Sequence, residues 1–158
     1  MALNEDIAAH AAAQRLEQLL PGSIERVRHD RGELTVWIPA ARLAAAMLAL
    51  RDDAELDFKL LCDLSCVDWR TADPRFEVAY QLYSVHRRDW LRVKVGANES
   101  APVPSVTSIW PTANWFEREV FDLFGVRFEG HPGLRRILLP DDWEGHPLRK
   151  DYPVEGYR

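Results

Sequence analysis

The fold is decided by DFKLLCDLSCVD at residues 57–68, FEVAYQL at 76–82 and LRVKV at 91–95. In all three stretches apolar side chains occupy alternate positions, which is the pattern of a β-strand with one buried face. The polar segment at residues 86–89 separates the last two stretches and predicts that they form an antiparallel hairpin. In the first stretch the alternating set is Phe58, Leu60, Cys62, Leu64 and Cys66.

Two helices and two further strands are predicted upstream of these stretches. Residues 4–20 carry an apolar stripe and residues 40–51 are rich in alanine, so both segments favour helices. Short strands are expected at residues 23–30 and 33–38. This order predicts an α+β fold: a two-layer sandwich with helices on one face of a mixed, mostly antiparallel sheet of about five strands.

The composition changes after residue 100, where seven of the ten prolines lie. Residues 114–124 favour a helix that ends at Gly125. From residue 126 onward no helical or strand period persists, yet large apolar side chains remain frequent. We therefore expect a core domain at residues 1–100, a connecting segment and helix at 101–125, and an extended, partner-binding C-terminal arm at 126–158. The arm is expected to be more mobile in the isolated chain.

Composition and charge exclude several classes of function. The 158 residues carry a formal net charge of −5, so the chain has no basic excess to bind the phosphates of a nucleic acid. The longest apolar run has eight residues, at 43–50, whereas a membrane-spanning helix needs about 20. The acidic N-terminus does not resemble a signal peptide. Nucleotide-binding glycine loops and zinc-protease motifs are absent from the sequence.

Cys62 and Cys66 are the only two cysteines. Two thiols cannot supply a four-cysteine iron–sulfur cluster or an all-cysteine zinc site. On a regular strand their separation is about 13 Å, so they are not expected to hold one ion together. The pattern predicts buried, unreactive cysteines and a chain that binds no redox cofactor of its own.

The last predicted helix carries a dense group of charges: Glu117, Arg118, Glu119 and Asp122. Paired carboxylates would suit acid–base catalysis, but no pocket is visible in the sequence. Arg118 and Asp122 are four residues apart and would pair on a solvated helix face. We favour a third interpretation, a charge network between subunits, because this helix leads directly into the arm.

The arm contains a short repeated motif: EGHP at residues 129–132 recurs at 144–147. Glycine and proline at these positions favour rigid turns. His131 and His146 are therefore expected to bond to the backbone rather than to a metal ion. Balanced signs in the arm suit ion pairs with a protein, and its tryptophans are either interface anchors or part of the domain's own packing.

The segment from Trp115 to Pro153 resembles a known family. It contains EREVFDLFGV at residues 117–126, GHP at 130–132, LRRIL at 134–138 and PDDWEGHPLRKDYP at 140–153. This run is similar to the C subunit of the proton-pumping NADH–quinone oxidoreductase, respiratory complex I. One departure is Gly133, where the family usually has an acidic residue.

The resemblance implies a hydrophilic subunit of the complex's peripheral arm, on the cytoplasmic side of a bacterial membrane. It implies that this chain holds no flavin, iron–sulfur cluster, quinone or metal and has no catalytic residues. Its implied role is to brace the D subunit, which helps form the quinone site, and the B subunit, which carries the terminal cluster. Alternatives are the matching subunit of a membrane-bound hydrogenase or ferredoxin-dependent complex, and a stand-alone soluble enzyme.

The residues expected to contact partners are Glu117, Arg118, Glu119, Asp122, His131, Arg135, Arg136, Trp143, His146, Arg149, Lys150 and Asp151.

Overall fold

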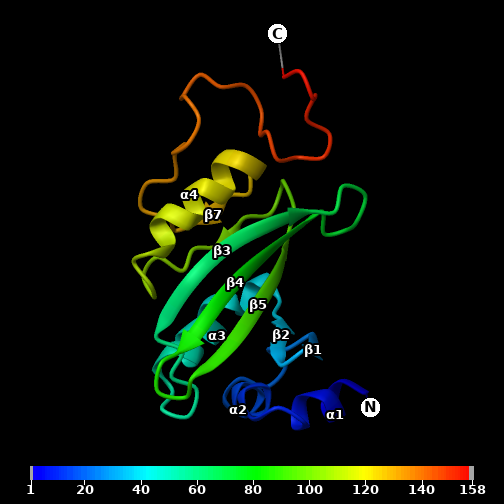
Figure 1. The fold of residues 1–158 in the computed structure, drawn as a ribbon, viewed down its shortest axis with the longest axis vertical. Coiled ribbons are helices and arrows are strands. Elements are labelled where there is room, and N and C mark those ends of the chain that lie inside the picture. The colour runs from blue at the N-terminus through cyan, green and yellow to red at the C-terminus, as the bar shows by residue number, and fades with distance from the viewer. Residues whose placement is uncertain (1, 157–158) are drawn as a thin grey trace.

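The computed structural model describes residues 2–156 and centres on one five-stranded sheet (Figure 1). Its strands run in the order β1-β2-β5-β4-β3, and every neighbouring pair is antiparallel except β2 and β5. The strands are β1 (Arg26–Asp30), β2 (Glu33–Trp37), β3 (Leu60–Asp68), β4 (Phe76–Ser84) and β5 (Asp89–Ala97). The predicted mixed, mostly antiparallel sheet is confirmed.

Within the described residues, four helices accompany the sheet: α1 (Ala2–Ala8), α2 (Ala11–Leu19), α3 (Ala40–Asp52) and α4 (Ala113–Phe124). Figure 1 shows α1 and α2 at one end of the sheet and α4 at the other, beside β3. The alternating residues of β4 and β5 face the helices, and Val78, Tyr80 and Val93 are fully buried there. The α+β sandwich inferred from the alternation is therefore confirmed.

The hairpin of β4 and β5 has the predicted antiparallel register, with Tyr80 opposite Val93 and Leu82 opposite Leu91. Helix α4 also ends as expected, since Gly125 adopts a left-handed conformation with φ 77°. A side chain at Gly125 would in addition collide with Arg149 and His146, so this position needs glycine for two reasons.

The prediction of one continuous helix at residues 4–20 was wrong, because the helix is interrupted between α1 and α2. Ile7 in α1 and Leu16 in α2 are both buried in the core. They are nine residues apart, about two and a half turns of continuous helix, which would place them on opposite sides. The break at Ala9 and His10 lets both side chains enter the same core.

The alternation predicted for the first half of β3 was also wrong. The register shifts between Leu61 and Asp63, so Cys62 lies in a β-bulge. One extra residue reverses the parity of the strand. Leu61 is therefore buried, whereas Leu60 and Cys62 are exposed. The expectation of a buried Cys62 fails for this reason, and Cys66 is only partly buried.

A second, two-stranded sheet was not predicted. Strands β6 (Val103–Pro104) and β7 (Phe128–Glu129) pair in parallel and join the start of the C-terminal arm to the segment that follows β5. Two-residue strands are too short to produce a recognisable period. Within residues 2–156, no helix has the length and apolar character required to cross a membrane.

Candidate functional site

The junction between α4 and the C-terminal arm is organised by the carboxylate of Asp122, which is fully buried. Its Oδ2 accepts hydrogen bonds from three consecutive backbone N–H groups, those of Ile137, Leu138 and Leu139, at 3.0, 2.8 and 2.9 Å. Its Oδ1 accepts a hydrogen bond from Arg136 at 2.7 Å. Burial alone would raise the pKa of Asp122, but these donors outweigh it and hold the pKa below its usual range.

Arg136 connects the two halves of the arm. Besides Asp122, its guanidinium donates to the carbonyl oxygens of Trp143 and Gly145 at 2.8 and 3.0 Å. The local pair of Arg118 with Asp122, predicted from their spacing, is not formed. Arg118 instead donates to the carbonyls of Arg135 and Arg136. The arm, which has little regular structure, is thus fixed by side chains that satisfy its backbone groups.

The two histidines of the repeated EGHP sequence hydrogen-bond to the backbone, as predicted. The N–H of Gly133 donates to His131 Nδ1, so the Nε2 carries the proton and donates to the Asn114 carbonyl at 3.2 Å. His146 Nδ1 lies 2.8 Å from the Asp122 carbonyl. Burial lowers the pKa of His146, and the nearby Arg149 and Arg136 lower it further. Both rings therefore join the arm to α4. Among the described residues, no three histidine, cysteine or acidic side chains form a potential metal site.

A second fixed point joins the end of the arm to the sheet. Asp68, fully buried at the end of β3, accepts two hydrogen bonds from Arg75 and one from the backbone N–H of Lys150 at 2.8 Å. Arg75 also contacts Asp151 at 2.7 Å. We call these four residues, Asp68, Arg75, Lys150 and Asp151, the clasp. The hydrogen bonds from Arg75 are the main reason that the pKa of Asp68 lies far below its usual range.

A third carboxylate, Glu117, lies on the inner side of α4 and has no exposed surface. It accepts hydrogen bonds from the Ser105 hydroxyl and from the Val106 N–H, each at 2.7 Å. Burial raises the pKa of Glu117 to about 7, because the two hydrogen bonds only partly offset the loss of solvation. Glu117 thus attaches α4 to the turn that begins at Ser105.

We expect Glu117→Gln to change how stability depends on pH. Because the folded-state pKa lies above the usual value of 4.5, the folded chain retains a proton that the unfolded chain releases. The contribution of Glu117 is complete below pH 4.5 and declines by about 3 kcal/mol as the pH rises to about 7. Glutamine keeps the acceptor for Val106 without acquiring a charge.

Urea unfolding of both proteins at pH 5 and pH 8 tests this expectation. The variant should gain stability relative to the parent chain at pH 8 and gain much less at pH 5. Equal differences at both pH values would show that Glu117 is ionised without cost. Glu119→Gln, on the exposed side of the same helix, is the control.

Known proteins share this sequence and geometry. The sequence profile of the family described as respiratory-chain NADH dehydrogenase, 30 Kd subunit, matches residues 36–158. The match includes α3, β3 to β7, α4 and the arm. The chain belongs to this family.

Individual members are similar over most of the chain. The NADH-quinone oxidoreductase C subunit of Salinispora tropica is 50% identical over 149 residues, which cover 91% of this chain and 61% of that protein. The protein of the same name from a Roseiflexus species is 49% identical over 142 residues, covering 89% of this chain and 82% of its own length. The chain thus spans about three fifths of one relative and about four fifths of the other.

A solved structure shares the fold. The structure entitled "membrane-bound sulfane sulfur reductase (MBS), an archaeal respiratory membrane complex" contains a chain with a TM-score of 0.75 and 28% identity. The likeness covers 96% of this chain and 86% of that chain. The fold of the 30 Kd family therefore also occurs in another respiratory membrane complex.

In this member of the 30 Kd family, the twelve residues predicted to contact partners fall into three groups: buried, half-buried and exposed. Glu117 and Asp122 are fully buried, so both act within the chain rather than at its surface. The half-buried ones are Arg118, His131, Arg136, His146 and Arg149. The exposed ones are Glu119, Arg135, Trp143, Lys150 and Asp151. Direct contact with a partner stays a prediction for the exposed and half-buried residues.

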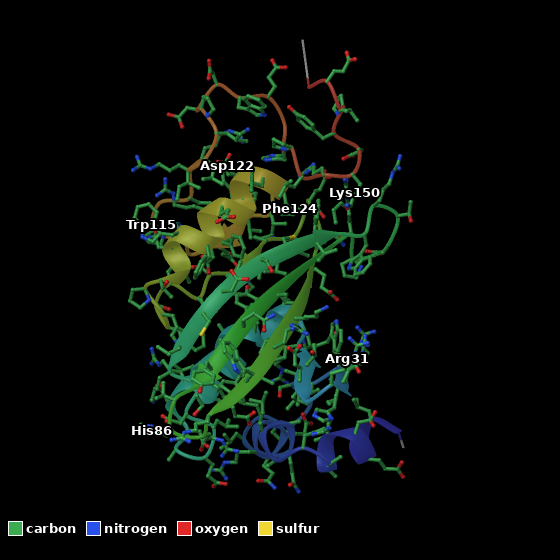
Figure 2. The ribbon with its side chains drawn as sticks, in the orientation of Figure 1. Arg31, His86, Trp115, Asp122, Phe124 and Lys150 are labelled. Carbon is green, nitrogen blue, oxygen red and sulfur yellow. The ribbon has the colours of Figure 1, made fainter. Side chains whose placement is uncertain are left out.

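Several large apolar side chains near the junction are exposed. Leu138, Trp143 and Leu148 of the arm are 61%, 41% and 49% exposed. Trp115 on α4 is 60% exposed and points away from the sheet in Figure 2. Trp110, in contrast, is buried and donates to the Lys59 carbonyl. The tryptophans were expected to be either interface anchors or part of the domain's own packing. Trp110 has the second role.

The clasp residues Asp68 and Arg75 were missed as functional candidates. One signal was present, because Asp68 continues the inward positions of Leu64 and Cys66 along β3. An acidic residue at an inward position needs a charged or hydrogen-bonding partner. The partner lies beyond a turn, and Lys150 lies 82 residues away, so the sequence did not identify either.

Proposed function

We propose that this chain is a non-redox structural subunit, the C subunit, of a proton-translocating NADH–quinone oxidoreductase. In this role it belongs to the peripheral arm of the complex, on the cytoplasmic side of a bacterial membrane. It braces the D subunit at the quinone site and the B subunit that carries the terminal cluster. Membership of the 30 Kd family supports this assignment, as do the names of the relatives in Salinispora and Roseiflexus.

The observation that carries the proposal is an arm that is hydrogen-bonded to α4 and to the sheet and still exposes apolar side chains. Asp122, Arg136 and the clasp hold the backbone of the arm in one shape. Leu138 and Trp143 nevertheless remain in contact with solvent. Exposed apolar side chains on a fixed backbone suit protein binding, because little conformational entropy is lost when the partner docks.

A bracing subunit acts on the reaction through geometry. Electron transfer and quinone chemistry need cofactors and reacting groups to be held in place, and a rigid neighbour provides that support. The two cysteines support a non-redox role, since Cys62 lies in an exposed bulge and Cys66 is half-buried on the same strand. Burial raises the pKa of Cys66 to about 12, so its thiol stays protonated at neutral pH.

The test is to place a charge on the exposed apolar side chains. Leu138→Asp or Trp143→Asp should reduce the amount of assembled complex in membranes, because loss of an interface anchor costs about 2 kcal/mol or more. Quinone-reductase turnover per assembled complex should stay near the parent value. Leu48→Asp on α3, where leucine is 46% exposed, is the matched control and should leave assembly unchanged.

The opposite result would contradict the proposal. A full amount of intact complex whose turnover is reduced by several powers of ten would place these residues in the reaction path. Co-purification from membranes, with the attached proteins identified by mass, tests the assignment of the D and B subunits as neighbours.

A second candidate is the equivalent subunit of a related membrane-bound hydrogenase or ferredoxin-dependent complex. The observation in its favour is the fold shared with the sulfane sulfur reductase complex. Membranes that lack this chain distinguish the two candidates. Loss of NADH-dependent quinone reduction supports the first candidate, whereas loss of only hydrogen- or ferredoxin-dependent activity supports the second.

A further inference from the structure

A groove of about 860 Å³ lies on the sheet, and none of its lining residues belongs to the arm. Its walls are β1, β2, parts of β4 and β5, and the loop at residues 69–75 between β3 and β4. Figure 1 shows this loop projecting from the end of the sheet on the side where β1 and β2 lie. The aromatic residues Trp37 and Trp69 both line the groove, and Trp69 is 54% exposed.

The loop wall is fixed in position. The Trp69 N–H donates to the Arg75 carbonyl at 2.9 Å and closes the loop at its base. Pro74 packs on β5 at Gly96, where any side chain would collide with the proline ring. The same loop is anchored to the C-terminal arm through the clasp, because Arg75 binds both Asp68 and Asp151. One wall of the groove is thus linked, through the clasp, to the arm that is proposed to meet partner subunits.

The opposite wall carries a guanidinium that is placed by stacking on an indole rather than by hydrogen bonds. Arg26 lies opposite Trp37 on the neighbouring strand, with its guanidinium carbon 3.5 Å from the ring centroid. Trp37 is itself held by a 2.8 Å hydrogen bond to Glu77, and Glu77 also pairs with Lys94 at 2.7 Å. Among the described residues, the Arg26 side chain has no hydrogen-bonded or salt-bridged partner, although its charge attracts the nearby carboxylate of Glu77.

This arrangement favours a carboxylate ligand. A guanidinium that stacks on an indole keeps its N–H donors in the plane of the group, where they match the two oxygens of a carboxylate. The groove lining has mixed charge, since Glu25 and Asp73 lie there beside Arg26, so a single carboxylate at Arg26 meets less repulsion than a polyphosphate would. The tryptophans offer apolar surface beside Arg26, and the volume accommodates several side chains.

We propose that this groove binds an extended segment of a partner subunit in which a carboxylate side chain stands next to an apolar one. The carboxylate pairs with Arg26, and the apolar side chain packs against Trp37 and Trp69. This inference rests on the proposed function, since it requires a multi-subunit complex. It adds a second contact surface, on the sheet, to that of the arm.

Site-specific photocrosslinking in membranes tests the inference. The photoreactive residue p-benzoylphenylalanine replaces Ala72, an exposed position that lines the groove, and the linked peptides are sequenced by mass spectrometry. We expect a crosslink to a partner segment that contains an aspartate or glutamate. Arg26→Glu should reduce its yield about tenfold. Arg42→Glu, on the exposed side of α3, should not. Changing the identified partner carboxylate to arginine should restore the yield in the Arg26→Glu background.

A parallel probe at Leu138 separates the two proposals. If the Leu138 probe links partner subunits and the Ala72 probe does not, the groove proposal is overturned and the proposed function stands. If neither probe links a partner, the proposed function fails. Linkage at Ala72 only to lipid or to a second copy of this chain, or a yield unaffected by Arg26→Glu, also overturns the groove proposal.

Discussion

Asp122→Ala is expected to release the C-terminal arm from α4. The substitution leaves three backbone N–H groups and the Arg136 guanidinium without their buried acceptor. Loss of one member of a buried charged pair costs about 3–5 kcal/mol. The arm can open and expose these groups to water, so the penalty should appear as local opening rather than as complete unfolding.

Hydrogen exchange measures this opening directly. The amides of residues 137–139 should lose at least about a hundredfold of their protection, while amides in β4 and β5 keep theirs. Asp142→Ala, at an exposed position of the arm, should leave protection unchanged. Arg136→Ala should act in the same direction and lower the amount of assembled complex. Unaltered protection in Asp122→Ala would show that the arm is held by contacts other than this carboxylate.

Arg75→Ala is the second substitution expected to have a large effect. It leaves the fully buried carboxylate of Asp68 without its cationic partner, again at a cost of about 3–5 kcal/mol. Asp151→Asn removes a different partner of Arg75, but Asp151 is 54% exposed, so its loss should cost less than about 1 kcal/mol. Urea unfolding at pH 7 should separate the two variants clearly.

Acid should reduce the difference between Arg75→Ala and the parent chain. Because the pKa of folded Asp68 is depressed, its pairing contributes fully above the ordinary aspartate range and is lost as the pH falls below it. The stability difference should therefore be largest at pH 7 and smaller at pH 3. A constant difference across this range would mean that Arg75 stabilises the chain by packing on Phe76 rather than by its charge.

The sequence predicted those features that depend on local patterns. Alternation in FEVAYQL and LRVKV identified the hairpin, and Gly125 identified the end of α4, because each pattern lies within one element. The break before α2 and the bulge at Cys62 were missed, since both follow from how the elements meet in the core. Tertiary contacts of this kind leave no local signal.

The candidate site was predicted in composition but not in geometry. The family motif directed attention to α4 and the arm, and hydrogen bonds from both histidines to the backbone were foreseen. Helical spacing alone suggested that Asp122 pairs with Arg118. Its actual donors lie 14 to 17 residues further along an irregular segment, where no period indicates which groups meet.

The long separation between Asp68 and Lys150 has a consequence for biosynthesis. The sheet and α4 leave the ribosome before the arm does, and folding generally begins with the earlier part of a chain. Asp122 and Asp68 are then already positioned when residues 136–151 emerge, and the arm adopts its shape on a finished template. A nascent chain that has not folded its sheet cannot present a formed arm. Docking to neighbouring subunits would in this way select for chains that have already folded.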